Sequence, residues 1–111
     1  MVERLQSQLD EAIVSHQQGK LARARAYETI LKAKPDHFDA LHLLGVIAIQ
    51  TKKYHLSVEL IGQAIAIYPN DAGFYSYRGI ALQNLKRLRD AVAHFDKAIS
   101  LKPDFAKAHN N

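Results

Sequence analysis

The sequence predicts an all-α fold assembled from repeated pairs of helices, and three observations carry that prediction. The three prolines, Pro35, Pro69 and Pro103, are separated by two equal intervals, a period of about 34 residues. Between them, apolar residues recur at helical spacing in two blocks per unit. Short polar segments, TKK and KRL, join the two blocks of the later units. A period of this length is typical of solenoids, in which each helix pair buries its apolar face against its neighbours.

The first unit, about residues 4–37, is the least regular of the three. Ala12 stands where the later units carry glycine, and Ala24 stands at a small-residue position of the second block. That second block, ARARAYETILKAK, leads directly to Pro35. We expect two helices here as well, joined by a turn at Gly19, because glycine is the residue that most readily leaves a helix.

The second and third units, about residues 38–71 and 72–105, match each other closely. The block FDALHLLGVIAIQ is followed by HLSVELIGQAIAIY, and GFYSYRGIALQNL is followed by LRDAVAHFDKAIS. Small residues recur at the same interval as the prolines, as in Gly45 and Gly79 or Ala64 and Ala98. We expect these small residues to let two antiparallel helices approach closely.

Each proline predicts the end of one helix, and the polar residue after it predicts the start of the next. The expected N-caps are Asp36, Asn70 or Asp71, and Asp104. The final segment PDFAKAHNN repeats the start of a unit, which predicts a partial fourth repeat over residues 106–111. We therefore expect residues 1–111 to form a single domain that is a piece of a longer array.

This pattern resembles the tetratricopeptide repeat (TPR). The positions that carry the resemblance are Leu41, Leu44, Gly45, Tyr54, Ser57, Ala64 and Pro69 in the second repeat, and Tyr75, Gly79, Leu88, Ala91, Phe95, Ala98 and Pro103 in the third. Arg78 departs from the pattern, because a leucine usually precedes the glycine. The resemblance implies a right-handed superhelical solenoid of antiparallel helix pairs. The segment PDHFDALHLLGVIA also resembles repeats that precede bacterial glycosyltransferase or sulfotransferase domains.

The resemblance further implies a concave groove lined by the first helix of each repeat. The residues that map to this groove are Asp39, His42, Leu43, Val46, Ile49, Gln50, Ser76, Tyr77, Ile80, Gln83, Asn84 and Asn111. Such a groove predicts a non-enzymatic scaffold that binds a peptide or a neighbouring domain, with Leu43 and Tyr77 as anchors. The alternatives are burial of this wall by adjoining repeats, and a substrate-presenting arm of a larger transferase. Chaperone cofactors that resemble this pattern hold a terminal carboxylate with inner-wall Lys, Asn and Arg, whereas the corresponding places here are Leu43, Val46, Gly73 and Tyr77.

Composition limits the remaining possibilities. The chain has no cysteine, and none of its six histidines is paired at the i, i+4 spacing of a zinc-binding helix. We expect no metal, no cofactor and no catalytic group, and the lack of a long apolar run favours a cytoplasmic protein without a membrane segment. Basic residues gather in the turns, notably Lys52, Lys53 and Arg87. These neutralise helix ends or meet an anionic partner, although no aromatic set for nucleic-acid stacking accompanies them. Self-association through the unfinished C-terminal helix is a further expectation.

Overall fold

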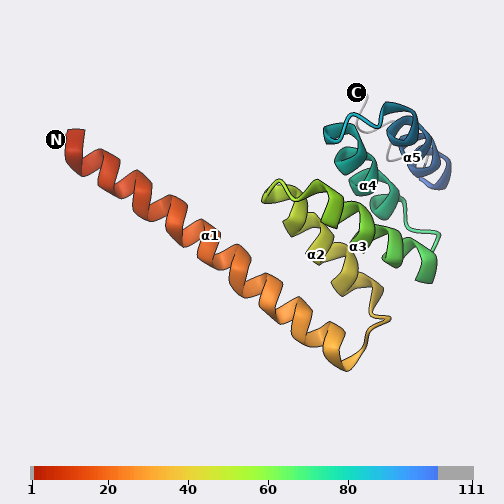
Figure 1. Ribbon diagram of the computed structural model, residues 1–111, viewed down its shortest axis with the longest axis horizontal. Helices are drawn as coiled ribbons and strands as arrows, with labels where there is room; N and C mark the ends of the chain where they lie inside the picture. Colours follow the sequence, from red (N-terminus) through yellow and green to blue (C-terminus); the bar gives the residue numbers. More distant parts are fainter. Residues whose placement is uncertain (1, 103–111) are drawn as a thin grey trace.

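The computed structural model describes the backbone of residues 2–102 and the side chains of residues 18–102. This part of the chain contains five helices and no strand: α1 (Val2–Ala33), α2 (Phe38–Gln50), α3 (Tyr54–Ile67), α4 (Ala72–Asn84) and α5 (Leu88–Leu101). The later four form two helix pairs, α2 with α3 and α4 with α5, stacked side by side (Figure 1). The predicted all-α solenoid is confirmed, and the helices of the second and third repeats begin and end close to the predicted blocks.

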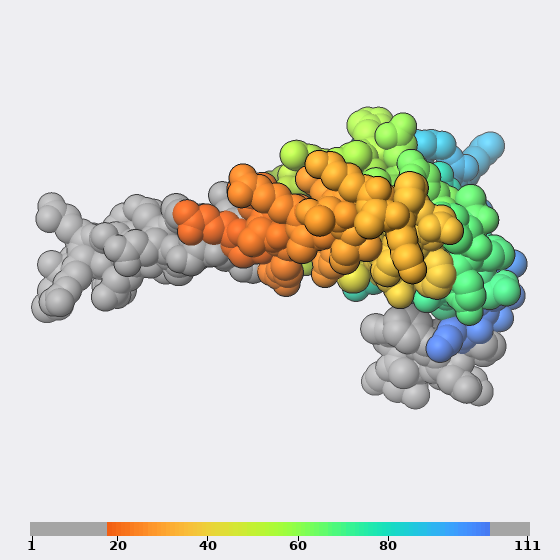
Figure 2. Space-filling view, turned by 90° about the horizontal axis from the view of Figure 1, so that it is seen from below, coloured from red at the N-terminus to blue at the C-terminus, as the bar shows by residue number. Residues whose placement is uncertain are grey.

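The first repeat differs from the expected helix–turn–helix, because α1 runs as one helix through Gly19. Within the described residues, α1 contacts only α2 among the other helices, and its N-terminal half extends away from the stack (Figure 1). The expected turn is therefore wrong. A lone glycine among strong helix formers costs only about 1 kcal/mol, which does not by itself end a helix. In Figure 2 the orange surface of α1 lies across one side of the stack, and the green and blue surfaces of later helices emerge beside it.

The turns that do form share one backbone arrangement at equivalent positions of the second and third repeats. Lys52 and Lys86 adopt left-handed conformations, with φ of 64° and 65°. The next residue in each turn, Lys53 or Arg87, donates its backbone N–H to the carbonyl of Ala48 at 2.7 Å or of Leu82 at 2.9 Å. This bond satisfies a carbonyl that the end of the helix would leave unpaired. It closes each pair so that the second helix returns along the first.

The helix starts distinguish between the expected caps. Asp71 caps α4, since its Oδ1 accepts hydrogen bonds from the backbone N–H groups of Gly73 at 2.8 Å and Phe74 at 3.4 Å. Asp36 does not cap α2; instead His37 Nδ1 accepts from Ala40 N at 3.1 Å. The expectation for Asp36 was wrong because α2 starts at Phe38, which leaves residue 37 at the capping position. The expected cap at Asp104 and the partial fourth repeat lie outside the described residues.

Two apolar clusters form the core of the stack. The first contains the buried residues Leu41, Ile61, Ala64 and Phe74, and the second contains Val58, Ala81, Leu82 and Ala91. Ile49 of α2 packs against both clusters and joins them. The stack is therefore continuous from α2 to α5, which fixes α2 and α4, the first helices of the two pairs, relative to each other.

Candidate functional site

The predicted wall residues lie on two neighbouring helices. Six of them, Asp39, His42, Leu43, Val46, Ile49 and Gln50, lie on α2, and five, Ser76, Tyr77, Ile80, Gln83 and Asn84, lie on α4. Asn111 lies outside the described residues. Because α2 and α4 are the first helices of adjacent repeats and contact each other, residues from both contribute to one surface. The contact between the two helices brings His42 and Tyr77 together, and we call the eleven predicted groove residues of α2 and α4 the α2–α4 wall.

The centre of the α2–α4 wall is a contact between His42 and Tyr77. The ring centroids are 5.2 Å apart, and the planes are inclined by 58°. The His42 ring also lies 4.6 Å from the ring of Phe74, which is buried. Tyr77 itself remains 39% exposed, and Leu43 remains 38% exposed. Tyr77 thus packs against His42 on one side, and both Tyr77 and Leu43 are still accessible to a partner.

Burial sets the charge of His42. Removal from water lowers the pKa of His42 below its ordinary value of 6.5, and the carboxylates of Asp71 and Asp39 oppose this with a smaller upward effect. Its Nδ1 atom is buried without a hydrogen-bond partner in the described part of the chain. The imidazole is consequently neutral near pH 7, and it contributes an apolar ring face to the wall.

The amide side chains of the wall lie at the C-terminal ends of α2 and α4, whereas Asp39 and Ser76 lie in the N-terminal halves of these helices. Gln50, Gln83 and Asn84 are exposed. The side-chain nitrogen of Asn84 donates to the backbone carbonyl of Ile80 at 2.9 Å, which leaves its amide oxygen as the atom that can accept from a ligand. Ile49, by contrast, packs against the core clusters and is half-buried. The accessible wall is accordingly apolar in its middle and carries amides at one end.

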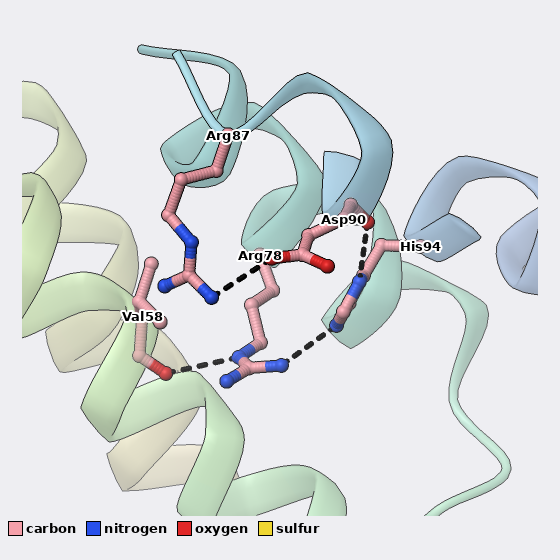
Figure 3. A network of polar contacts seen from close by, with 5 residues as sticks. All are labelled: Val58, Arg78, Arg87, Asp90 and His94. Carbon is pink, nitrogen blue, oxygen red and sulfur yellow. Dashed lines mark hydrogen bonds and ion pairs between the residues drawn. The ribbon is translucent and has the colours of Figure 1, made fainter. Parts of the chain in front are cut away.

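A second polar arrangement, which the sequence pattern did not predict, lies between α3, α4 and α5 (Figure 3). Arg78 donates from Nε to the backbone carbonyl of Val58 at 3.0 Å, and its NH1 group lies 2.7 Å from Nε2 of His94. A Cβ atom at Gly62 would lie 3.3 Å from Nε of Arg78, so the glycine leaves room for the guanidinium. The signal in the sequence was Arg78 itself, at a position where this repeat usually has leucine.

The tautomer of His94 follows from its two partners. Arg78 can only donate, so Nε2 must accept, and the Nδ1–H group donates to the backbone carbonyl of Asp90 at 2.8 Å. Burial and the neighbouring Arg87 lower the pKa of Arg78, whereas Asp90 raises it, and the guanidinium stays charged at any ordinary pH. Arg87 and Asp90 form an exposed ion pair at 2.8 Å. This arrangement is structural, because it ties three helices together away from the wall.

Part of the predicted basic edge lines a hollow between α1 and the end of α2. The hollow has a volume of about 540 Å³, and its lining residues are Lys20, Leu21, Ala24, Ile47, Gln50, Thr51, Lys52 and Lys53.

Neither a metal site nor a membrane-spanning helix has support among the described residues. These contain no group of three or more histidine, cysteine or acidic side chains suited to a metal ion. Likewise, no helix within residues 2–102 has the length and apolar character required to cross a membrane.

Comparison with known proteins agrees with this architecture. A curated relative, the protein STIP1 homolog of Dictyostelium discoideum, is 37% identical over 65 residues, which cover 59% of this chain and 12% of the relative. The peroxisomal targeting signal receptor of Candida albicans is 32% identical over 68 residues, which cover 61% of this chain and 12% of that protein. The chain thus spans about an eighth of the length of these relatives.

Solved structures show the same fold. The first TPR of Spaghetti (RPAP3) bound to the HSP90 peptide SRMEEVD aligns with a TM-score of 0.75 and 20% identity, over 79% of this chain and 70% of that one. MamA from Desulfovibrio magneticus RS-1 aligns with a TM-score of 0.72 and 24% identity, over 81% of this chain and 51% of that one. Two family models of the tetratricopeptide repeat match residues 9–72 and 72–105. The chain therefore belongs to the tetratricopeptide repeat family.

Proposed function

We propose that the chain is a protein-interaction scaffold whose α2–α4 wall binds a segment of a partner protein. The observation that carries this proposal is the exposure of Leu43 and Tyr77 on adjacent first helices, with Tyr77 packed against His42 and His42 in turn packed against Phe74. A rigid pair of anchors costs little ordering on the protein side when a ligand binds. The exposed amides of Gln50 and Gln83 then pair with the backbone of the bound segment.

The charge of the wall indicates which segments fit. The described wall residues include no lysine or arginine, and Asp39 is the acidic residue among them. His42 is neutral near pH 7 because burial lowers its pKa. An acidic carboxy-terminal tail would meet no cation on this wall and would be repelled by Asp39. We therefore propose a neutral or basic ligand with apolar anchors, in extended or helical form.

A peptide selection tests this proposal directly. Random peptides of about twelve residues are selected for binding to the chain, and the dissociation constants of the best are measured by fluorescence anisotropy. The double variant Leu43→Ala, Tyr77→Ala should bind about 10–100-fold more weakly, because buried aromatic and aliphatic anchors carry most of the affinity of such interfaces. The synthetic peptide SRMEEVD serves as an acidic probe, and we expect no binding to it.

The matched control removes apolar surface of similar size elsewhere. Leu56 and Leu88 are exposed at 43% and 58% and lie on α3 and α5, outside the wall. The double variant Leu56→Ala, Leu88→Ala should keep the affinity of the original chain. Equal losses in the two double variants, or tight binding of SRMEEVD, would refute the proposed site.

The resemblance to repeats that precede glycosyltransferase or sulfotransferase domains stays a prediction about a larger protein. In that setting the same wall would hold the substrate segment for a catalytic domain. The role of Leu43 and Tyr77 as anchors is common to both cases, so the peptide experiment addresses either one.

A further inference from the structure

A row of exposed apolar side chains runs along α5. Leu88, Val92 and Ile99 are exposed at 58%, 58% and 49%, and they recur at the spacing of one helical face. We call these three residues, with the adjoining half-buried Phe95, the α5 stripe. The flank of α5 that adjoins the stripe on one side is buried, since Ala91 and Ala98 are only 2% and 3% exposed. Scattered exposed leucines are ordinary in soluble proteins, but a continuous row on one helix marks a contact surface.

The equivalent side chains of the preceding repeat, on α3, are covered by a neighbouring helix. Val58 is the counterpart of Val92 one repeat earlier and is only 8% exposed, because it packs with Ala81 and Leu82 of α4. Tyr54 and Ile65, the counterparts of Leu88 and Ile99, are likewise not exposed. Among the residues whose side chains the structure describes (18–102), the same pattern is therefore covered by a helix on α3 and open on α5. The α5 stripe is therefore an apolar surface against which another helix can pack.

The arrangement of the α5 stripe identifies a suitable occupant. Leu88 and Ile99 lie symmetrically about a point between residues 93 and 94, and Val92 and Phe95 lie symmetrically about the same point. If a second α5 lies antiparallel across the first, Leu88 of each copy meets Ile99 of the other. Val92 of each copy likewise meets the accessible part of the half-buried Phe95 of the other, whose ring packs against Gly79 of its own chain. The row is thus complementary to itself, as a twofold contact requires.

The charges beside the α5 stripe match the same arrangement. Arg89 and Asp96 are about two helical turns apart, so they lie on the same flank of the helix, on the side away from buried Ala91 and Ala98. In an antiparallel twofold pair, this flank of one helix faces the same flank of the other. Arg89 of each copy then lies near Asp96 of the second copy, which forms two reciprocal ion pairs.

We propose that the chain forms a twofold dimer in which the α5 stripes of two copies pack antiparallel. This surface is distinct from the α2–α4 wall, so each copy keeps its wall available for a ligand. A contact between two single helix faces is small compared with stable dimer interfaces, and we expect a dissociation constant in the micromolar range, on the order of 1–100 µM.

Sedimentation velocity of the 111-residue chain, from about 1 µM to about 500 µM, tests the dimer. We expect the weight-average mass to rise from monomer toward dimer with concentration. Val92→Glu should abolish this rise, because it places two charges in the middle of the contact. The control Ala66→Glu adds the same charge at an exposed position of α3, on a different helix from the α5 stripe and its charged flank, and should leave the dimer intact. Circular dichroism shows that each variant is folded.

Charge reversal tests the geometry of the pairing. Arg89→Asp alone places like charges opposite each other in both reciprocal pairs, and the dimer should dissociate about tenfold more readily. Arg89→Asp combined with Asp96→Arg restores opposite charges and should restore the original constant. A monomer at every concentration would overturn the proposal, and would indicate that the α5 stripe packs against another helix of a longer chain. A dimer that survives Val92→Glu would overturn it by placing the contact elsewhere, for example on α1.

Discussion

Gly79 lies directly against the ring of Phe95, so that a Cβ atom at position 79 would lie 2.8 Å from Cε1 of the ring. The same relationship recurs one repeat earlier, where a Cβ atom at Gly45 would overlap Cγ1 of Ile61. In the second and third repeats alike, a glycine on the first helix receives a large side chain from the second helix. This contact sets the distance between the two helices of a pair, and the predictions below begin with it.

Gly45→Ala should destabilise the fold by about 1–3 kcal/mol, because the added methyl group overpacks a well-filled contact. Ile61 is fully buried and cannot move aside, so relief must come from a shift of α2 or α3. Gly19→Ala is the matched control: nothing lies within 4 Å of its added Cβ atom. Since Gly19 is helical, this change should stabilise the chain by about 0.5–1 kcal/mol. Urea denaturation monitored by circular dichroism measures both, and a destabilising Gly19→Ala would contradict a continuous α1.

The contact between Arg78 and His94 should behave as a coupled pair. Arg78→Ala leaves the buried side of His94 without its donor and should cost about 1–3 kcal/mol of unfolding free energy. In a double-mutant cycle with His94→Ala, the loss of unfolding free energy in the double variant should be smaller than the sum of the two single losses by about 0.5–1.5 kcal/mol. The exposed pair Arg87 and Asp90 provides the comparison, with an expected coupling of at most about 1 kcal/mol. Strictly additive losses at Arg78 and His94 would contradict the arrangement in Figure 3.

His42 should make stability depend on pH. Because burial lowers its pKa in the folded state, the unfolded chain takes up the proton first as pH falls below 6.5. Proton uptake by the unfolded state favours unfolding. The contribution of neutral His42 is therefore fully present above about pH 6.5 and is lost as pH falls toward the lower folded-state pKa.

The measurement compares unfolding free energies at pH 7.5 and pH 5.5 for the original chain and for His42→Phe, which keeps an aromatic ring but does not titrate. The loss of stability between the two pH values should be smaller in His42→Phe. His55→Gln, which changes an exposed histidine of α3, should retain the original loss. The pH dependence would be assigned to other groups if His42→Phe and the original chain lost equal amounts.

Val58 and Val92 offer a comparison of one residue type in two environments. Val58→Ala should cost about 1–2.5 kcal/mol, because the side chain is 8% exposed and packs in a core cluster. Val92→Ala should change stability by less than about 0.5 kcal/mol at concentrations where the chain is monomeric, since the side chain is 58% exposed. Thermal or urea unfolding at low protein concentration checks both values. A large loss for Val92→Ala in the monomer would show that residue 92 is covered within one chain.

Replacement of Lys86 by glycine should increase the stability of the chain. Its φ of 65° lies in the left-handed region, where a side chain costs about 1 kcal/mol and glycine does not. Lys86→Gly should therefore stabilise the chain by about 0.5–1 kcal/mol, after the greater freedom of glycine in the unfolded state is allowed for. Lys97→Gly, in the interior of α5, should instead lose about 1 kcal/mol. Equal effects of the two substitutions on the melting temperature would argue against this turn conformation.

Local sequence determined the repeat and most of its helices. The regular spacing of the prolines, together with apolar residues at helical spacing, predicted α2 to α5 with their turns, and it limited the cap of α4 to Asn70 or Asp71, of which the structure shows Asp71. These features depend on contacts between residues close in the chain, so a single sequence contains them. The unbroken α1 was missed because Gly19 is compatible with either a turn or a helix, and only its flanking helix formers and its contacts decide between them.

Tertiary structure alone decided the environment of each side chain. The sequence places Val58 and Val92 at equivalent positions, yet one is covered by α4 and the other is exposed. It marks Arg78 only as a departure from the repeat, whereas the partners Val58 and His94 come from different helices. Burial, protonation and pairing depend on which neighbours reach a residue through space. The periodic pattern therefore determined the helices and their order, and the stacking of those helices decided which side chains form the core and which remain open to a partner.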